Sequence, residues 1–336
     1  MGVSLIMLNF FAGFVNMLIV AVILVIVFSP FMYWLIRKKV PVLISLVITM
    51  VIVISIVIAL FTFLIFSLSQ LSAAIPRYAA EMDGLIKSTQ NFFASFGLDV
   101  TDTEAVFALI EPTRLIDFVK EFLTSLMGVL SDTVFVFLIL AFLLMGVSGF
   151  AEKAEHIIGL GNPLVARWSK YSQDIRHYIV ITNNVGLMAG GLDAVMLMLI
   201  GVDFAILWGV LSWLLSYIPM VGFFLALIPP VILALLEFGW PTAVFVFIAY
   251  ILINSLIDDV LKPELMGEGL DLAPVMVLIS VLFWGLILGP LGSILAVPVT
   301  LGIKQLVLEA DPENRWLAEF ISSDKPRTDK AEASGK

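Results

Sequence analysis

Polar residues recur at intervals of four in a strongly apolar segment near the C-terminus. They are Tyr250, Asn254, Asp258 and Lys262, with Asp259 beside them. On a helix this spacing places the four on one face. Ionisable groups at membrane depth are costly and usually face a cavity or a partner. Asp258 and Asp259 could therefore bind a cation, carry a proton or accept hydrogen bonds from a polyhydroxylated substrate. Alternatively, both lie at the membrane interface, where Asp258 pairs with Lys262.

The apolar segment at residues 178–200 carries a second group of polar side chains. Asp193 lies near its middle and either lines a cavity or makes a buried structural hydrogen bond. Asn183 and Asn184 are either contacts between helices or ligands. The candidate residues for substrate binding or ion coupling are Asn183, Asn184, Asp193, Asn254, Asp258 and Asp259.

The composition is that of a polytopic membrane protein. The chain has 336 residues, of which 61% are hydrophobic and 13% charged, and its mean hydropathy is +1.11. A formal charge of -9 argues against nucleic acid as a partner. With no Cys, no HExxH and no GxxxxGK[ST] motif, we expect no enzyme, no metal site, no cofactor and no ATP-driven export by this chain alone.

Two apolar stretches, residues 204–236 and 273–306, are each interrupted by proline and glycine. Each arm, at about 14–16 residues, spans about 21–24 Å as a helix, which is short of the ~30 Å hydrocarbon thickness. We therefore predict two re-entrant helical hairpins, with kinked spanning helices as the alternative. Interrupted, duplicated segments of this kind point to the substrate site of a transporter. The predicted hairpin tips contain Pro219, Gly222, Gly289, Pro290 and Gly292.

Basic residues predict the orientation of these segments, since Lys and Arg accumulate in cytoplasmic loops. The first hairpin would enter and leave from outside and the second from inside, so that two units of span plus hairpin form an inverted repeat. Four full spans would satisfy the same charge distribution. The residues predicted to be cytoplasmic are Arg37, Lys38, Lys39, Lys153, Arg167, Lys170, Arg176, Lys262 and Lys304.

The acidic segment at residues 67–127 differs from the rest of the chain. From Leu71 to Phe96 its apolar residues follow a 4-3 spacing, which predicts a long amphipathic helix whose seam packs within one subunit or joins subunits. A second amphipathic helix is expected at residues 103–126. Asp203 is expected to cap the first hairpin helix.

We therefore predict an all-α polytopic membrane protein of a bacterial or archaeal plasma membrane, with an extracytoplasmic helical insert. Residues 3–28 cross once or as two short pieces. The predicted parts are N-terminal membrane helices (1–66), an extracytoplasmic acidic helical domain (67–127), a transmembrane helix (128–148), cytoplasmic amphipathic helices (149–177), a transport core (178–310) and a polar cytoplasmic tail (311–336).

Two blocks of this chain resemble a known family. The runs LLSYIPMVGFFLALIPPVILALLEFG, INSLIDDVLKPELMGEGLDLAPV and FWGLILGPLGSILAVPV are similar to those of the AI-2E family, also known as the autoinducer-2 exporter or PerM-like family. The resemblance implies export of small polar solutes, notably the quorum-sensing signal autoinducer-2. For some members it implies sodium/proton antiport, and it implies homo-oligomers, for which a pentamer is one candidate. Family members typically have Glu-Asn where this chain has Asp258 and Asp259.

The expected function is a secondary transporter that exports a small hydrophilic, autoinducer-2-like solute across the lipid bilayer. A sodium/proton antiporter, with Na+ or H+ bound at the acidic pair, is one alternative. A non-transporting oligomeric membrane scaffold is the other.

Overall fold

The computed structural model describes residues 2–95, 133–158, 163–266 and 271–323, and within these ranges the regular structure is entirely helical. Six of the described helices are long and apolar enough to cross a membrane. This confirms an all-α polytopic membrane protein. The six stretches are Gly13–Arg37, Val42–Met82, Pro163–Ile200, Val221–Phe238, Trp240–Met266 and Pro290–Leu308.

The first helix, α1 (Gly2–Arg37), is continuous, so residues 3–28 form one piece and not two. Pro30 lies inside it and has no N–H to donate to the carbonyl of Ile26. Arg176 from α6 supplies the missing donor, with its Nε 3.1 Å from the Ile26 oxygen. A proline in the first helix is thus compensated by an arginine distant in sequence.

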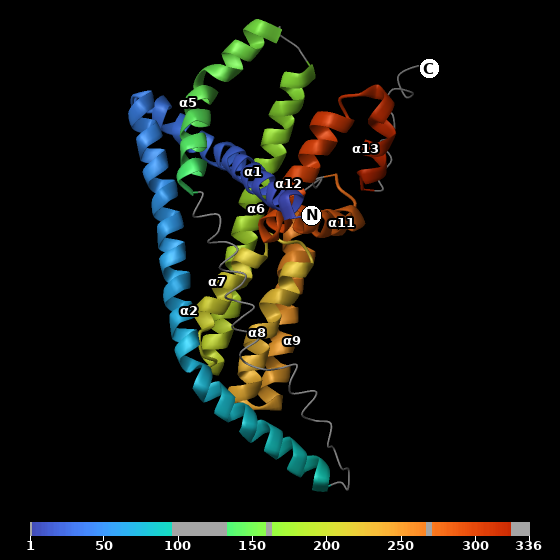
Figure 1. The fold of residues 1–336 in the computed structure, drawn as a ribbon. Coiled ribbons are helices and arrows are strands. Elements are labelled where there is room, and N and C mark those ends of the chain that lie inside the picture. Colours follow the sequence, from blue (N-terminus) through green and yellow to red (C-terminus); the bar gives the residue numbers. More distant parts are fainter. Residues whose placement is uncertain (1, 96–132, 159–162, 267–270, 324–336) are drawn as a thin grey trace.

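The second helix, α2 (Val42–Ser95), extends well beyond the predicted end of the membrane span at residue 66. It contains Pro76, a residue that commonly bends helices. Figure 1 shows α2 running along one side of the molecule and then turning across the end of α7 (Ala205–Leu215) and α8 (Val221–Phe238). The span and the first insert helix therefore form one helix.

The predicted seam of the insert packs within the subunit where the structure describes it. Leu71, Tyr78 and Met82 are 3%, 1% and 7% exposed and belong to the main hydrophobic core. Residues 96–132 lie outside the described ranges, and with them the helix predicted at residues 103–126.

Two long helices follow, α5 (Thr133–Ile158) and α6 (Pro163–Ile200). Helix α6 runs without a break through residue 177. It therefore includes both the end of the predicted cytoplasmic segment (149–177) and the predicted span that follows it. In the first half of α6, Tyr171 and Ile175 are buried against Leu301. Tyr171 also donates a hydrogen bond to the carbonyl of Pro298 at 3.2 Å.

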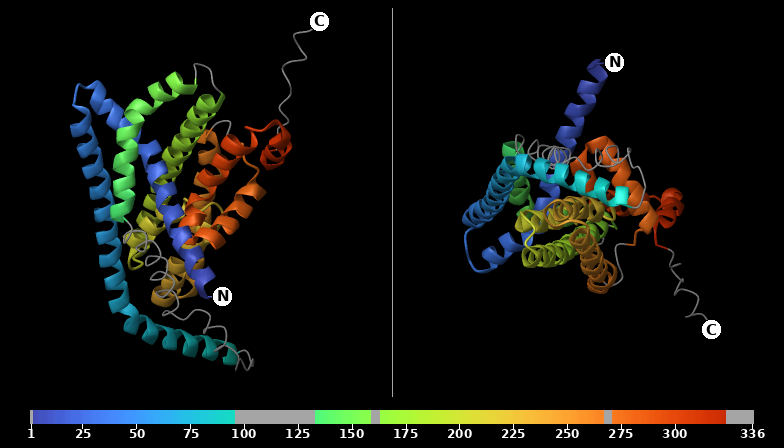
Figure 2. Two further views of the ribbon diagram at one scale, coloured as in Figure 1. Left: turned by 45° about the horizontal axis from the view of Figure 1, so that its top comes forward. Right: turned by 90° about the horizontal axis from the view of Figure 1, so that it is seen from below.

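The two interrupted stretches form two helix pairs, α7 (Ala205–Leu215) with α8 (Val221–Phe238), and α11 (Pro274–Leu288) with α12 (Pro290–Gly302). The helices end at the predicted breaks, where Met220 and Gly289 have φ of 63° and 74°. Figure 1 shows the first pair, together with α9, in the lower half of the view and the second pair higher up. Figure 2 shows the second pair folding back on itself beside α1.

A glycine lets the arms of each pair approach closely. A Cβ on Gly222 would overlap the carbonyl oxygen of Leu215, and one on Gly292 would overlap that of Trp284. The open end of each pair is also joined. The backbone N–H of Asp203 donates to Glu237 across the first pair at 3.2 Å.

The remaining elements connect and close the second pair. After α9 (Trp240–Ser255) come a π-helical segment, η2 (Leu256–Leu261), and the short α10 (Lys262–Met266). A second π-helical segment, η3 (Ile303–Leu308), extends α12. The short η4 (Pro312–Asn314) and α13 (Arg315–Ile321) follow, and the N–H of Ala273 donates to the carbonyl of Ile321 at 3.0 Å.

Candidate functional site

The site begins with a close contact between α6 and α7. A Cβ on Gly190 would overlap the carbonyl oxygen of Gly209, and one on Gly209 would overlap that of Gly190. One turn away, Gly186 faces Ser216. Gly186 and Gly190 are four residues apart, and this GxxxG spacing allows backbone contact between helices. This contact brings Ser212 of α7 next to Asp193 of α6.

Asp193 is at the centre of a hydrogen-bond network that joins three helices. Its side chain is fully buried, at 0% exposure. Ser212 Oγ donates to it at 2.8 Å, and Asn254 Nδ2 from α9 lies 3.2 and 3.3 Å from its two oxygens. The same amide donates to the carbonyl of Tyr250 at 3.0 Å. The Tyr250 hydroxyl is buried and has no hydrogen-bond partner among the residues that the structure describes.

The donors around Asp193 are neutral. Within the described part of the chain no Lys, Arg or His forms an ion pair with it. A buried carboxylate without a countercharge is costly, so it tends to take up a proton or a cation. Of the predicted candidates, Asp193 and Asn254 are therefore brought together in an arrangement suited to binding either.

Asn183 lies at the tip of the first helix pair. Its Oδ1 accepts bonds from Trp213 Nε1 at 3.3 Å and from the Tyr217 hydroxyl at 3.2 Å. Its amide donates to the exposed Asn184 at 3.5 Å. The geometry of Asn183 matches a contact between helices, one of its two predicted roles.

Asp258 and Asp259 are not part of the Asp193 network. They lie in the π-helical segment η2, whose wider turn shifts the register of the predicted polar stripe. Ile257 is buried at 2% exposure, whereas the Asp258 side chain is 37% exposed and Asp259 is exposed. Asp258 lies 3.5 Å from Lys262, as in the interface alternative.

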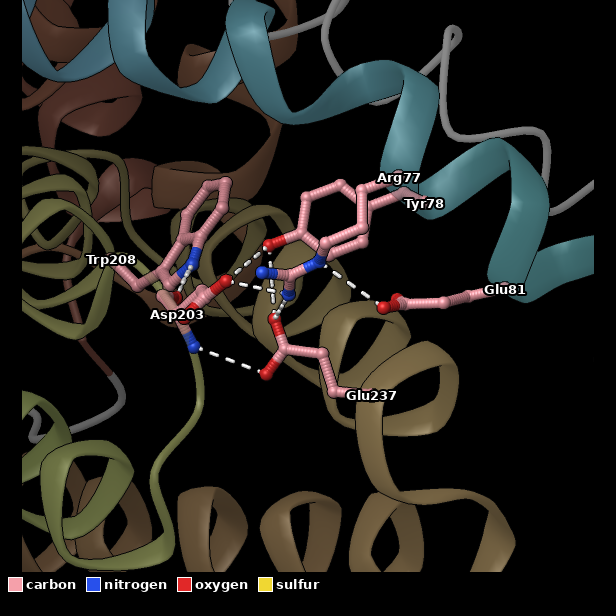
Figure 3. Close-up of polar contacts among 6 residues, drawn as sticks. All are labelled: Arg77, Tyr78, Glu81, Asp203, Trp208 and Glu237. Atoms are coloured by element: carbon pink, nitrogen blue, oxygen red, sulfur yellow. Dashed lines mark hydrogen bonds and ion pairs between the residues drawn. The ribbon is translucent and has the colours of Figure 1, made fainter.

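The open end of the first helix pair is occupied by a polar cluster, shown in Figure 3. Arg77 Nη2 lies 2.7 Å from Asp203 and 3.4 Å from Glu237, and its Nε lies 3.1 Å from Glu81. The Tyr78 hydroxyl lies 3.0 Å from Asp203 and 2.9 Å from Glu237. We call these five residues the outer clasp.

The prediction that Asp203 caps α7 is wrong. Phe204 occupies the cap position, with φ of 59° and no side-chain cap bond. The Asp203 carboxylate turns instead towards Arg77 and Tyr78 of α2, because a cationic partner and a phenol donor are available there. Its backbone carbonyl accepts a bond from Trp208 Nε1 at 3.1 Å (Figure 3).

The open end of the second pair is closed by a buried lysine. Lys304 Nζ, on a side chain 2% exposed, lies 2.8 Å from the carboxylate of Asp271. It also donates to the Asp271 backbone carbonyl and, at 2.7 Å, to Ser322. Each helix pair is therefore joined by charged side chains at its open end, which we call its mouth. No group of three or more potential metal-ligating side chains occurs among the described residues.

The helical fold and the polar residues within its apolar helices define a multi-pass membrane protein with a buried polar centre. The chain belongs to the AI-2E family of transporters, whose sequence profile matches residues 1–310. It is 28% identical to the AI-2 transport protein TqsA of Escherichia coli (strain K12) over 315 residues, covering 94% of this chain and 91% of the relative. It is 25% identical to the putative transport protein YhhT of the same strain over 319 residues, covering 94% and 90%. A putative transport protein of Haemophilus influenzae is 28% identical over 292 residues, covering 85% and 84%.

These relatives support a transporter that handles a small solute in a lipid bilayer. The structure adds residues that pattern reading missed, namely Ser212 in the network, Arg77 and Tyr78 in the clasp, and Asn16. Asn16 Nδ2 donates to the carbonyl of Leu288, at the tip of the second pair, at 2.9 Å.

Proposed function

We propose that this protein is a secondary transporter that exports a small hydrophilic, autoinducer-2-like solute. The observation that carries the proposal is the buried Asp193 network, which joins α6, α7 and α9 at membrane depth. The similarity to a protein named for AI-2 transport, over 94% of this chain, supports the choice of solute.

Coupling to an ion runs through Asp193 in this proposal. A carboxylate held by Ser212 and Asn254 without a countercharge can take up H+ or Na+ in one state and release it in another. The exposed Asp258 and Asp259 would act, if at all, at the aqueous end of this path. Sodium/proton antiport, the second candidate, uses the same carboxylate without an organic solute.

We further propose that both helix pairs are re-entrant and that they form inverted repeats. The bonds that join Asp203 to Glu237, and Asp271 to Lys304, bring the two ends of each pair together. The shortness of α7, with 11 residues, and of α11, with 15, supports re-entrant pairs over two full spans. The first mouth would face outside and the second would face the cytoplasm of a bacterial cell, with homo-oligomeric assembly, a pentamer being one candidate.

Flux measurements test the coupling. We expect purified protein in proteoliposomes to move autoinducer-2 at a rate that depends on an imposed proton or sodium gradient. Asp193→Asn keeps the size and most hydrogen bonds of the side chain, so it should assemble normally but lose this dependence. The double variant Asp258→Asn/Asp259→Asn is the matched control, and it should retain the gradient dependence if Asp193 is the coupling group.

The outcomes separate the alternatives. If only the control variant loses gradient dependence, the coupling site lies in η2 and our assignment of Asp193 is wrong. Ion flux without autoinducer-2 flux favours the antiporter. Absence of both, in a protein that assembles normally, favours the membrane scaffold.

Cysteine scanning tests the helix pairs, and the chain contains no native Cys to interfere. We replace Pro219 and Pro290 by Cys, one at a time, and label each variant with an impermeant reagent. If the pairs are re-entrant, neither Cys should be labelled exclusively from the membrane face opposite to the mouth of its own pair. Such labelling would mean that the arms span fully.

A further inference from the structure

The outer clasp joins the part of α2 after residue 66, which we call the insert helix, to both arms of the first helix pair, α7 and α8. Arg77 and Tyr78 follow Pro76 in α2, whereas Asp203 precedes α7 and Glu237 lies in the last turn of α8. Tyr78 is 1% exposed and the Glu237 side chain 6% exposed, whereas the Arg77 and Asp203 side chains are 53% and 38% exposed. Within the clasp, Tyr78 and Glu237 are therefore the groups shielded from water. Opening the mouth would separate these groups.

The Tyr78 hydroxyl lies between two carboxyl oxygens that also accept from Arg77 Nη2. The Tyr78 hydroxyl carries one hydrogen, yet it lies 3.0 Å from an Asp203 oxygen and 2.9 Å from a Glu237 oxygen. It can donate to only one of them. The other oxygen then faces a phenol lone pair, which is unfavourable unless that carboxyl carries a hydrogen of its own.

The charges of the clasp lead to the same conclusion. One guanidinium, that of Arg77, faces three carboxyl groups: Asp203 and Glu237 in the centre and Glu81 on the rim. Arg77 Nη2 is shared between the two central carboxyls at 2.7 and 3.4 Å. With all three ionised, the clasp would carry a net charge of about -2, and the repulsion would act most strongly on Glu237, because its side chain is 6% exposed whereas those of Asp203 and Glu81 are 38% and 31% exposed.

We infer that the buried Glu237 carries a proton that it shares with the Tyr78 oxygen, while Tyr78 donates to Asp203, and that Arg77 and Tyr78, by binding these two acidic residues, hold the mouth of the first helix pair shut. The closed state binds one proton more than the open state, so it is favoured at low pH. It is lost as pH rises, because removal of the proton leaves two ionised groups on one phenol. This goes beyond the proposed function, since it assigns a proton-linked latch to the insert helix.

Met82 and Gly84 provide a matched pair of reporters on the insert helix itself. Met82 lies one turn beyond Tyr78 on the buried face, at 7% exposure. Gly84 is exposed and nothing lies within 4 Å of the place where its Cβ would be. Cysteines at these positions, in purified protein in lipid nanodiscs, are labelled with a maleimide between about pH 6 and about pH 9. The ratio of the two rates cancels the intrinsic pH dependence of the thiol.

We expect the Met82→Cys to Gly84→Cys rate ratio to be low at acid pH and to rise with pH, by at most about tenfold per unit for a single linked proton. Glu237→Gln supplies an N–H in place of the shared proton, so the ratio should stay low and lose its pH dependence. Arg77→Gln and Tyr78→Phe should raise the ratio at every pH, and Arg77→Lys should restore it in part.

Two results would overturn the inference. One is a ratio that does not change with pH in the otherwise native protein. The other is a Glu237→Gln variant whose ratio rises with pH as before. Both variants keep Arg77, so they decide the matter even if its replacement prevents folding. Labelling is read without any transport assay, so failure of the latch and failure of the transport function are distinguishable.

Discussion

The glycine contact between α6 and α7 leads to a prediction in which neighbouring glycines serve as each other's control. Gly190→Ala adds a methyl group that would overlap the carbonyl of Gly209, and it would also lie 3.1 Å from the backbone N of Trp213. Gly191→Ala, one residue along the same helix, adds a methyl group with nothing within 4 Å. Both changes gain the same helix propensity of about 1 kcal/mol, so the difference between them isolates the contact.

The magnitude follows from what can move. Gly190 meets backbone and not the end of a flexible side chain, so relief requires α6 and α7 to separate, at about 1–3 kcal/mol for overpacking. A separation of about 1 Å would also stretch the 2.8 Å bond from Ser212 to Asp193 beyond hydrogen-bond range. Losing that bond to a buried carboxylate adds about 1–3 kcal/mol. Gly190→Ala should thus be about 2–6 kcal/mol less stable than Gly191→Ala.

Thermal unfolding of the two variants in the same detergent, followed by size-exclusion chromatography, measures this difference. Gly186→Ala provides an intermediate case, because its new methyl group meets the Ser216 hydroxyl, a side-chain atom that can rotate away. The expected order of stability is Gly191→Ala, then Gly186→Ala, then Gly190→Ala. If Gly190→Ala and Gly191→Ala melt together, the two backbones do not touch and the Ser212–Asp193 bond loses its structural basis.

Two further predictions concern polar groups elsewhere. Arg176→Met should destabilise the protein by about 1–2 kcal/mol, because the Ile26 carbonyl left open by Pro30 loses its donor. In the Pro30→Ala background the N–H of residue 30 supplies that donor itself, so Arg176→Met should lower the stability by less. Equal destabilisation in both backgrounds would show that Arg176 does not compensate for Pro30. Lys304→Met should be nearly neutral in thermal unfolding, since it replaces a buried charge by an apolar side chain of similar volume. Asp271→Ala should destabilise the protein by about 1–3 kcal/mol, because it leaves the ammonium of Lys304 buried without its carboxylate partner. A Lys304→Met variant less stable than Asp271→Ala would contradict this account.

Much of the architecture could be predicted because membrane depth permits few backbone solutions. Two apolar stretches interrupted by proline and glycine located both helix pairs, and the ends at Met220 and Gly289 match the predicted breaks. The predicted arm length was wrong for one arm of each pair, because Val221–Phe238 and Pro290–Leu308 are long enough to cross a membrane. The close contact at Gly190 accompanies the GxxxG spacing of Gly186 and Gly190, which is visible in the sequence. Such patterns are local, so they are visible in the sequence.

The candidate site was only partly predictable, because its partners come from segments far apart in the chain. Asp193 and Asn254 were candidates, but nothing local to Ser212 marks it as the donor between them. The wide turn of η2 removed Asp258 from the stripe, and a steps-of-four count cannot detect a π-helical register shift. Asp203 was assigned a local role as a cap because Arg77, its actual partner, is distant in sequence.

The two helix pairs meet the same physical requirement with different residues. In the proposed re-entrant arrangement the tips lie at membrane depth, where the last groups of a helix have no water to bind, so another element must supply a partner. At the second tip Asn16 of α1 donates to the Leu288 carbonyl, and at the first tip Asn183 of α6 binds Trp213 and Tyr217. In both cases an asparagine on a long helix holds the tip, whereas charged groups join the mouth. A tip held by one or two neutral hydrogen bonds is easier to release than a mouth held by ion pairs. Conformational change in the core is therefore expected to begin at the tips, next to the buried network of Asp193, and to reach the mouths afterwards.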